Sequence, residues 1–295
     1  MVNCPKCAFE CAAGGLECPR CGVIFSRLDE PAGRETPRVI VTADGWAEAG
    51  RFDGAVGKTM ITGAILAAVV TVLPFPRFVI GYMGTLLHEF GHAAAAWAFG
   101  YPAIPAFNFQ HGGGVTSIDD RLWPLMLLWI GGLMWLLWRY RTHRPAWPLL
   151  AIPSALYLAL ALTRVHEIVI TFMGHGMVLT IAGVFLYRAL SGSAVKVAAE
   201  RPLYAFLGFF LVLDEMLFAW GLTTSLERRI EYGLELNGIP GDWMRIADRL
   251  SMELASATGA YLMLTPVPLA LALLFFRYRE RIFDSLSRQL RLTVT

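Results

Sequence analysis

FVIGYMGTLLHEFGHAAAAWAF (residues 78–99) is the stretch that decides how this chain folds. It is mostly apolar and long enough to cross a lipid bilayer as one helix, which takes about 20 residues. Near its middle, however, it carries His88, Glu89 and His92. An ionised side chain at the centre of a membrane span costs about 2.5–3.5 kcal/mol on insertion scales. Polar residues in such a place therefore indicate a functional site inside a membrane helix.

The rest of the chain repeats the apolar pattern. Of its 295 residues 56% are hydrophobic and only 16% are charged, whereas a soluble domain carries about 25% charged residues. A large soluble helical core is the alternative, but it does not explain why the apolar runs recur at the length of a bilayer. We interpret seven runs as candidate membrane spans, at residues 59–73, 78–99, 122–138, 146–163, 165–187, 203–222 and 255–276.

These runs predict an all-α polytopic membrane protein with six or seven transmembrane helices, integral to a bacterial inner membrane. A short β-hairpin is expected at residues 104–118, around a run of three glycines, and a charged, helix-prone stretch at 225–253. The predicted domains are a zinc ribbon at 1–27, a linker at 28–57, a transmembrane metalloprotease domain at 58–276 and a basic surface tail at 277–295. The run at 59–73 is the shortest, so it is the weakest candidate span.

The N-terminal segment carries two CxxC pairs, Cys4 with Cys7 and Cys18 with Cys21, and one further cysteine, Cys11. Two such pairs can complete a tetrahedral shell of four thiolates around a structural Zn²⁺. Two disulfides are the alternative if the segment lies in an oxidising compartment. The segment resembles a short zinc ribbon, which implies contact with a protein partner. The net charge of +2 gives no reason to expect nucleic acid.

The opening stretch contains the pattern HExxH, from His88 to His92. Residues four apart lie on the same face of a helix, so both imidazoles can bind one metal ion. Glu89 would then act as general base toward a water molecule that Zn²⁺ activates. Gly91 and the alanines at 93–96 leave a slim face where another helix or a substrate can come close. A polar contact between two helices is the alternative explanation.

The stretch LLHEFGHAAAAWAFG (residues 86–100), followed by HGGGVTSI (residues 111–118), resembles the site-2 protease family of intramembrane zinc metalloproteases. The resemblance implies a zinc endopeptidase that cuts membrane-embedded segments of proteins or peptides. It implies that His88 and His92 bind a catalytic Zn²⁺ and that Glu89 is the general base. It also implies that the hairpin at 104–118 lies near the substrate, whose extended chain could pair with a free strand edge.

One feature of that family is missing from the place where it is expected. The third zinc ligand of the family is an aspartate in an LDG motif, which follows an NPxPx run. Here TPVPL (residues 265–269) has similar prolines, but no aspartate in an LDG motif follows. Catalytic zinc usually has three protein ligands and an open position for water, so another residue must complete the shell.

We predict that His175, near the middle of the run at 165–187, is the third ligand, and Asp214 is the alternative. If His175 binds zinc, Asp214 or Glu215 could accept a hydrogen bond from the second nitrogen of a ligand histidine. His166 and Glu167, at the start of the same run, are interpreted as a polar pair at the membrane interface.

Two functions are compatible with these residues. The first is an intramembrane protease, which Glu89 favours because a structural zinc site needs no base beside it. The second is a non-proteolytic membrane adaptor that retains a zinc site, which the missing aspartate favours. Membrane lipids and a membrane-protein or peptide substrate are the expected partners, together with a protein partner at the zinc ribbon.

Overall fold

The computed structural model describes residues 2–4, 10–11, 18–19, 21, 54–108, 113–142, 146–234 and 240–291. The chain divides into two compact units, Met1–Glu48 and Ala49–Thr295, and each is described by itself. The division falls inside the predicted linker at 28–57. In the first unit, strands β1 (Val2–Asn3) and β2 (Glu10–Cys11) pair antiparallel.

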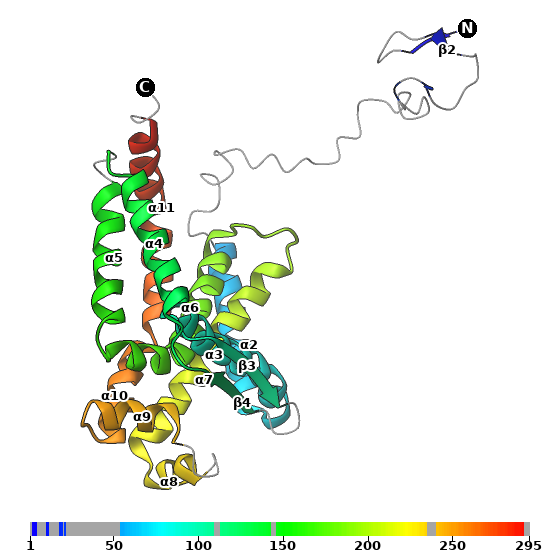
Figure 1. The fold of residues 1–295 in the computed structure, drawn as a ribbon. Helices are drawn as coiled ribbons and strands as arrows, with labels where there is room; N and C mark the ends of the chain where they lie inside the picture. Colours follow the sequence, from blue (N-terminus) through cyan, green and yellow to red (C-terminus); the bar gives the residue numbers. More distant parts are fainter. Residues whose placement is uncertain are drawn as a thin grey trace. The chain divides into compact units, whose positions relative to one another are not determined.

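The second unit is mostly helical, and each of the seven predicted apolar runs forms helix (Figure 1). Its helices are α2 (Gly54–Val72), α3 (Pro74–Ala98), α4 (Trp123–Arg139), α5 (Ala146–Ala161), α6 (Val165–Ser191), α7 (Glu200–Thr224), α8 (Leu226–Leu234), α9 (Asp242–Arg249), α10 (Leu254–Leu264) and α11 (Val267–Arg291). The charged stretch at 225–253 supplies α8 and α9, as expected.

The last predicted span differs from the prediction in two ways. It is broken into α10 and α11 at Thr265 and Pro266, because a proline lacks the N–H that would continue the helix. In addition, α11 runs without interruption past residue 276 to Arg291. The basic tail predicted from residue 277 is therefore, as far as residue 291, the continuation of the last helix.

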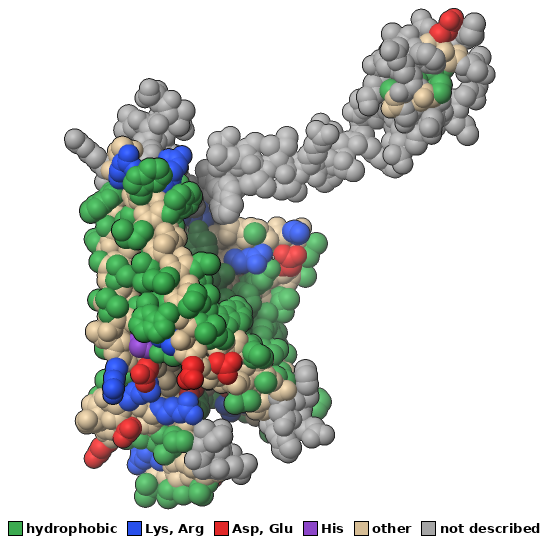
Figure 2. Space-filling model, in the orientation of Figure 1, with side chains coloured by type: hydrophobic (Ala, Val, Ile, Leu, Met, Phe, Trp, Pro, Cys, Tyr) green, Lys and Arg blue, Asp and Glu red, His purple; other side chains and the backbone are tan. Residues whose placement is uncertain are grey.

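Four stretches of the described chain are long and apolar enough to cross a membrane: Gly54–Val72, Val165–Ser191, Glu200–Thr224 and Leu254–Arg279. The first covers residues 59–72 of the run that was the weakest candidate, and its helix begins earlier, at Gly54. Apolar helices α4 and α5 are shorter, at 17 and 16 residues. On the face in view, hydrophobic side chains cover the middle of this unit and charged ones gather toward its ends (Figure 2). Such a large exposed apolar surface is that of a membrane protein.

Helix α6 lies at the centre of the second unit, where it packs against α3, α7 and α11. Small residues let these helices approach closely. A Cβ atom added to Gly91 of α3 would lie 2.1 Å from the backbone carbonyl oxygen of Met173 on α6. A Cβ on Gly63 of α2 would lie 2.4 Å from the Cβ of Ala205 on α7. The slim face predicted around Gly91 is thus the contact face with α6.

The predicted hairpin is present as β3 (Ala103–Asn108) and β4 (Gly113–Ile118). The strands pair antiparallel, with Ala103 opposite Ile118. Both strands lie against α3, the helix that carries the HExxH pattern. The hairpin therefore forms one side of the surroundings of the two histidines.

Candidate metal centre

Three ligand atoms converge beside α3. The Nε2 atoms of His88 and His92 lie 2.9 Å apart, and Asp242 Oδ2 lies 2.9 Å from each of them. Atoms bound at 2.0–2.2 Å around one zinc ion would be separated by about 3–3.5 Å. A small outward adjustment would therefore let the three atoms hold one ion, and the donor set of two imidazoles and a carboxylate suits zinc.

The two histidines are held in place by α6. His92 Nδ1 donates a hydrogen bond to the carbonyl oxygen of Ile170, at 2.8 Å. This bond directs Nε2, the other ring nitrogen, toward the convergence point, as in many zinc sites. Gly174 leaves room for both rings, because a Cβ there would lie 2.4 Å from His92 Nε2 and 2.7 Å from His88 Cε1.

Asp242 was not among the ligands predicted from the sequence. It is the first residue of α9, outside the four candidate spans. The next residue, Trp243, is buried and packs against Tyr261 with 4.6 Å between the ring centroids, and its backbone N–H donates to the Tyr232 hydroxyl. Gly241 lies so close to Tyr232 that a Cβ would be 2.5 Å from the tyrosine hydroxyl. These contacts anchor the start of α9 and thereby place Asp242.

The electrostatic surroundings of Asp242 keep it ionised. Burial alone would raise the pKa of this carboxyl group, but its hydrogen bonds to His88 and His92 outweigh burial and hold the pKa well below its usual range. Asp242 follows Pro240 and Gly241. This local sequence does not match the LDG pattern, so no local signal pointed to Asp242.

His175 lies next to the three atoms, whereas Asp214 does not. The ring centroids of His175 and His88 are 4.5 Å apart, and the ligand atoms of His175, His88 and Asp242 all lie within 4.8 Å of one another. His175 Nδ1 donates to Glu215 Oε2 at 2.8 Å, as expected for a carboxylate that holds the second nitrogen. Asp214 instead forms an ion pair with Arg77 at 2.8 Å.

The carboxylate of Glu89 lies between α3 and the hairpin. The Thr116 hydroxyl donates to Glu89 Oε2 at 2.6 Å. The side chain passes over Gly114, where an added Cβ would lie 2.6 Å from Glu89 Oε1. A cavity of about 290 Å³ is lined by Glu89, the ligand atoms, the hairpin and Arg245. The arrangement places an acidic side chain, a candidate metal site and a strand around one space.

His166 and Glu167, predicted to form a pair, have separate partners. His166 hydrogen bonds to the Tyr101 hydroxyl at 2.7 Å and to the Thr163 carbonyl oxygen. Glu167 forms an ion pair with Arg249, the last residue of α9. The second contact ties the far end of α9 to the start of α6.

In the first unit, four cysteines lie together. The Sγ atoms of Cys4 and Cys21 are 3.6 Å apart, as are those of Cys11 and Cys18. Sulfur atoms bound at about 2.3 Å around one tetrahedral zinc ion are separated by about 3.8 Å, so the spacing fits a metal. Burial and the neighbouring Cys18 thiol raise the pKa of Cys11 to about 11. Cys7 lies outside the described residues.

Comparison with known proteins adds no further information about this site. No protein-family model matches the chain, and no characterised protein or solved structure shows significant similarity to it.

Proposed function

We propose that the protein is an intramembrane zinc metalloprotease that cuts peptide bonds of membrane-embedded substrates. The observation that carries the proposal is the convergence of His88, His92 and Asp242 within 2.9 Å of one another, with the carboxylate of Glu89 on the same cavity. The resemblance to the site-2 protease family supports the same reaction.

The third ligand in this proposal is Asp242. Its carboxylate oxygen lies 2.9 Å from both histidine nitrogens, and a carboxylate is also what the resemblance implies. His175 retains its place beside the metal site, where Glu215 orients it. We do not propose Asp214 as a ligand, because it forms an ion pair with Arg77.

Each residue around the cavity has a role in hydrolysis. When bound, zinc acts as a Lewis acid that activates water and polarises the carbonyl group of the peptide bond to be cut. Glu89 accepts the proton from the attacking water and delivers it to the leaving amine. The Thr116 hydroxyl fixes the Glu89 carboxylate at 2.6 Å. Strand β4, which lines the same cavity, presents the substrate as an extended chain.

The four candidate spans support a location in a membrane, and we propose that the protein is a multi-pass protein of a bacterial inner membrane. The C-terminal end of α4 and the C-terminal half of α11 lie at the same end of the second unit (Figure 1). Arg139 and Arg141 are at the first of these, and Arg277, Arg279 and Arg281 near the second. By the positive-inside rule this end faces the cytoplasm.

The test of the protease is the substitution Glu89→Gln in the full chain, with Glu227→Gln on the exposed side of α8 as control. Glu89→Gln is expected to retain the zinc content of the wild type and to lose cleavage of single-span membrane substrates by about 10²-fold or more. Unchanged cleavage by Glu89→Gln would overturn the proposal.

The test of the third ligand compares zinc content in Asp242→Ala, His175→Ala and Asp214→Ala. The full chain is expected to hold two zinc ions, one at each site. Asp242→Ala should lower the number to one, and Asp214→Ala should leave it at two. A count of two in Asp242→Ala would reject Asp242 as a ligand.

One observation favours the adaptor as a second candidate. If His175 binds the ion together with His88, His92 and Asp242, four protein ligands close the shell and leave no position for water. The ligand atoms of His175, His88 and Asp242 lie close enough for this arrangement. Replacement of zinc by cobalt distinguishes the protease from the adaptor. The visible spectrum of a cobalt site with bound water changes with pH, whereas that of a closed site does not.

For the first unit we propose a zinc ribbon with a structural Zn²⁺ held by thiolates. The described cysteines Cys4, Cys18 and Cys21 offer ligand atoms within 4.8 Å of one another. A closed thiolate site stabilises a small fold and performs no chemistry, so this unit serves to bind a protein partner.

A further inference from the structure

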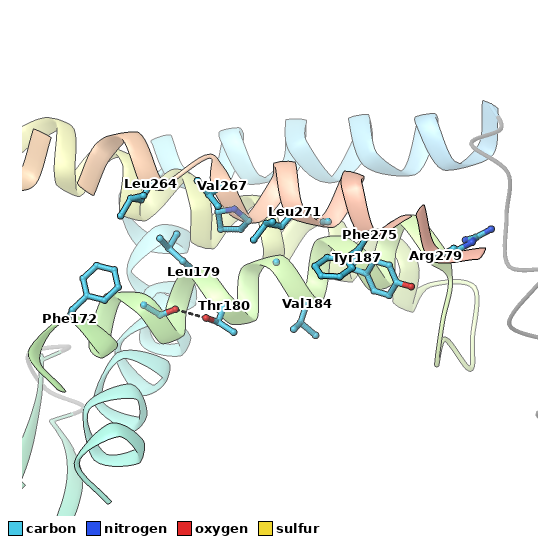
Figure 3. Close-up of a pocket in the computed structure, with 14 residues that line it drawn as sticks. Phe172, Leu179, Thr180, Val184, Tyr187, Leu264, Val267, Leu271, Phe275 and Arg279 are labelled. Atoms are coloured by element: carbon cyan, nitrogen blue, oxygen red, sulfur yellow. Dashed lines mark hydrogen bonds between the residues drawn. The ribbon is translucent and has the colours of Figure 1, made fainter. Parts of the chain in front are cut away.

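A second cavity, of about 650 Å³, lies between α6 and the two helices α10 and α11 (Figure 3). Leu179 and Val184 of α6 line it together with Leu271 and Phe275 of α11. At one end of this groove lies Arg279. None of the described residues that line the groove is acidic.

The dimensions of the groove suit a single hydrocarbon chain. On α6 it extends from Phe172 to Tyr187, which corresponds to about 22 Å along a helix. This exceeds one leaflet of the bilayer, which is about 15 Å, half of the hydrocarbon core. A helical span about 30 Å long and 10 Å across has several times the volume of the groove. The groove therefore fits an acyl chain better than a transmembrane helix.

In the middle of the groove the walls are apolar, so an occupant there needs no hydrogen-bonding groups. The one hydroxyl group there, on Thr180, donates to the carbonyl oxygen of Gly176 in the same helix at 2.7 Å. Gly183 lies against Pro268, where an added Cβ would be in ordinary contact at 3.5 Å. Small residues on α6 thus leave the space open, and its surface is apolar.

The end of the groove at Arg279 is basic, whereas its middle is apolar. Arg279 is only 7% exposed, and its guanidinium carbon lies 4.6 Å from the ring centre of Phe276. The Tyr187 side chain lies near it, with its hydroxyl at the same end (Figure 3). A basic group between membrane helices at the cytoplasmic side is a binding site for anionic lipid head groups.

We propose that this groove binds one acyl chain of an anionic phospholipid, with the lipid phosphate at Arg279. The apolar walls bury the chain, and the arginine forms charge-assisted hydrogen bonds with the phosphate. The head group lies at the end of the last candidate span, Leu254–Arg279, where the polar region of the bilayer begins. The proposal does not depend on the protease activity.

The experiment uses the full chain in vesicles that contain equal amounts of phosphatidylglycerol and phosphatidylcholine with identical acyl chains, and a small fraction of oleate. After extraction in mild detergent, the lipid retained by the protein is measured by mass spectrometry. The wild type is expected to retain phosphatidylglycerol in preference to phosphatidylcholine. Arg279→Gln should lower that preference about fivefold, the factor of one basic residue at an anionic surface. Arg277→Gln, an exposed arginine outside the groove lining, should not.

A second pair of variants tests the groove itself. Val184→Trp fills the groove from an exposed position on α6 and should lower retention of both phospholipids, whereas Leu128→Trp, on exposed surface of α4, should not. Equal retention of both phospholipids by the wild type, or phosphatidylglycerol retention unchanged in Arg279→Gln or in Val184→Trp, overturns the proposal. Retention of oleate alone rejects a phospholipid. Loss of cleavage in Val184→Trp with unchanged lipid points to a substrate segment and also overturns it.

Discussion

Glu89 depends on the absence of a side chain at Gly114. A Cβ at that position would lie 2.4 Å from Glu89 Cγ and 2.6 Å from Oε1. Because the end of a glutamate is flexible, a substitution would move the carboxylate rather than disrupt the hairpin. The hydrogen bond from Thr116 would then be lost. Gly114 is in this sense a positioning residue for the proposed general base.

Gly114→Ala is therefore expected to reduce cleavage by about 10²-fold, the lower end of what a general base contributes, while zinc content and thermal unfolding stay as in the wild type. Gly113→Ala is the matched control, because a Cβ there meets nothing within 4 Å. Cleavage rates and zinc content are measured for both. Equal cleavage by the two variants would contradict this role.

The two histidines could be predicted at this scale and the aspartate could not. His88 and His92 are one helical turn apart, so their spacing in the sequence already fixes their spacing in space. Asp242 meets them only through the packing of α9, a contact across 150 residues of chain. Neighbours on a helix also point in different directions, so Glu215 reaches His175 while Asp214 reaches Arg77. The sequence does not reveal such directions.

Helix α9 has eight residues, too few to be stable alone in water. Its position depends on the burial of Trp243, which is 3% exposed and packs against Phe172, His175 and Tyr261. We expect Trp243→Ala to release the start of α9 and to weaken zinc binding at Asp242 at least tenfold. Trp243→Phe, which keeps an aromatic ring in the same space, should retain most of the affinity. Zinc titration of both variants tests this, and equal affinities would contradict it.

Helices α3 and α6 make a contact without room for one more carbon atom. Gly91→Ala would bring a Cβ to 2.1 Å from the backbone oxygen of Met173, and a backbone atom cannot move aside as a side chain can. Overpacking of this kind is typically destabilising by about 1–3 kcal/mol. Gly81→Ala on the same helix meets nothing within 4 Å and serves as the control. Thermal unfolding should show a lower Tm for Gly91→Ala alone; equal Tm values would show that the helices separate freely.

At the element scale the sequence predicts nearly the whole fold. Apolar runs and a glycine-centred hairpin are local patterns, and each forms the expected helix or hairpin. Of the seven predicted spans, however, only four fall in described stretches that are long and apolar enough to cross a membrane, and α3 is not among these four. The boundaries in the last span were less predictable. Helix α11 continues past residue 276 because no helix-breaking residue lies between Arg277 and Arg291. The change from apolar to basic residues at residue 277 changes the environment of the helix, but it does not end the helix.

On the scale of the whole molecule, the chain has two units and two candidate metal sites, one in each. The second unit takes its histidines and its aspartate from three separate helices, α3, α6 and α9. The first unit takes its thiols from a segment of fewer than 30 residues. The two sites share no residue, so a substitution that removes the metal from one site should leave the metal at the other. The two CxxC pairs predict Cys7 as a ligand in the first unit, whereas there Cys11 lies 3.6 Å from Cys18.

Cys11→Ser in the full chain is accordingly expected to lower the zinc content from two ions to one, while His88→Ala removes the other ion and the double variant removes both. The raised pKa of Cys11, about 11, means that its thiol is protonated at neutral pH in the absence of metal. Zinc must displace this proton, so the affinity of the first unit for zinc should fall as the pH is lowered from 8 to 6. Zinc content measured after dialysis against a chelator at each pH tests both statements. If Cys11→Ser retained two ions, Cys7 would complete the shell instead. If His88→Ala held no more zinc than the double variant, the two sites would not be independent.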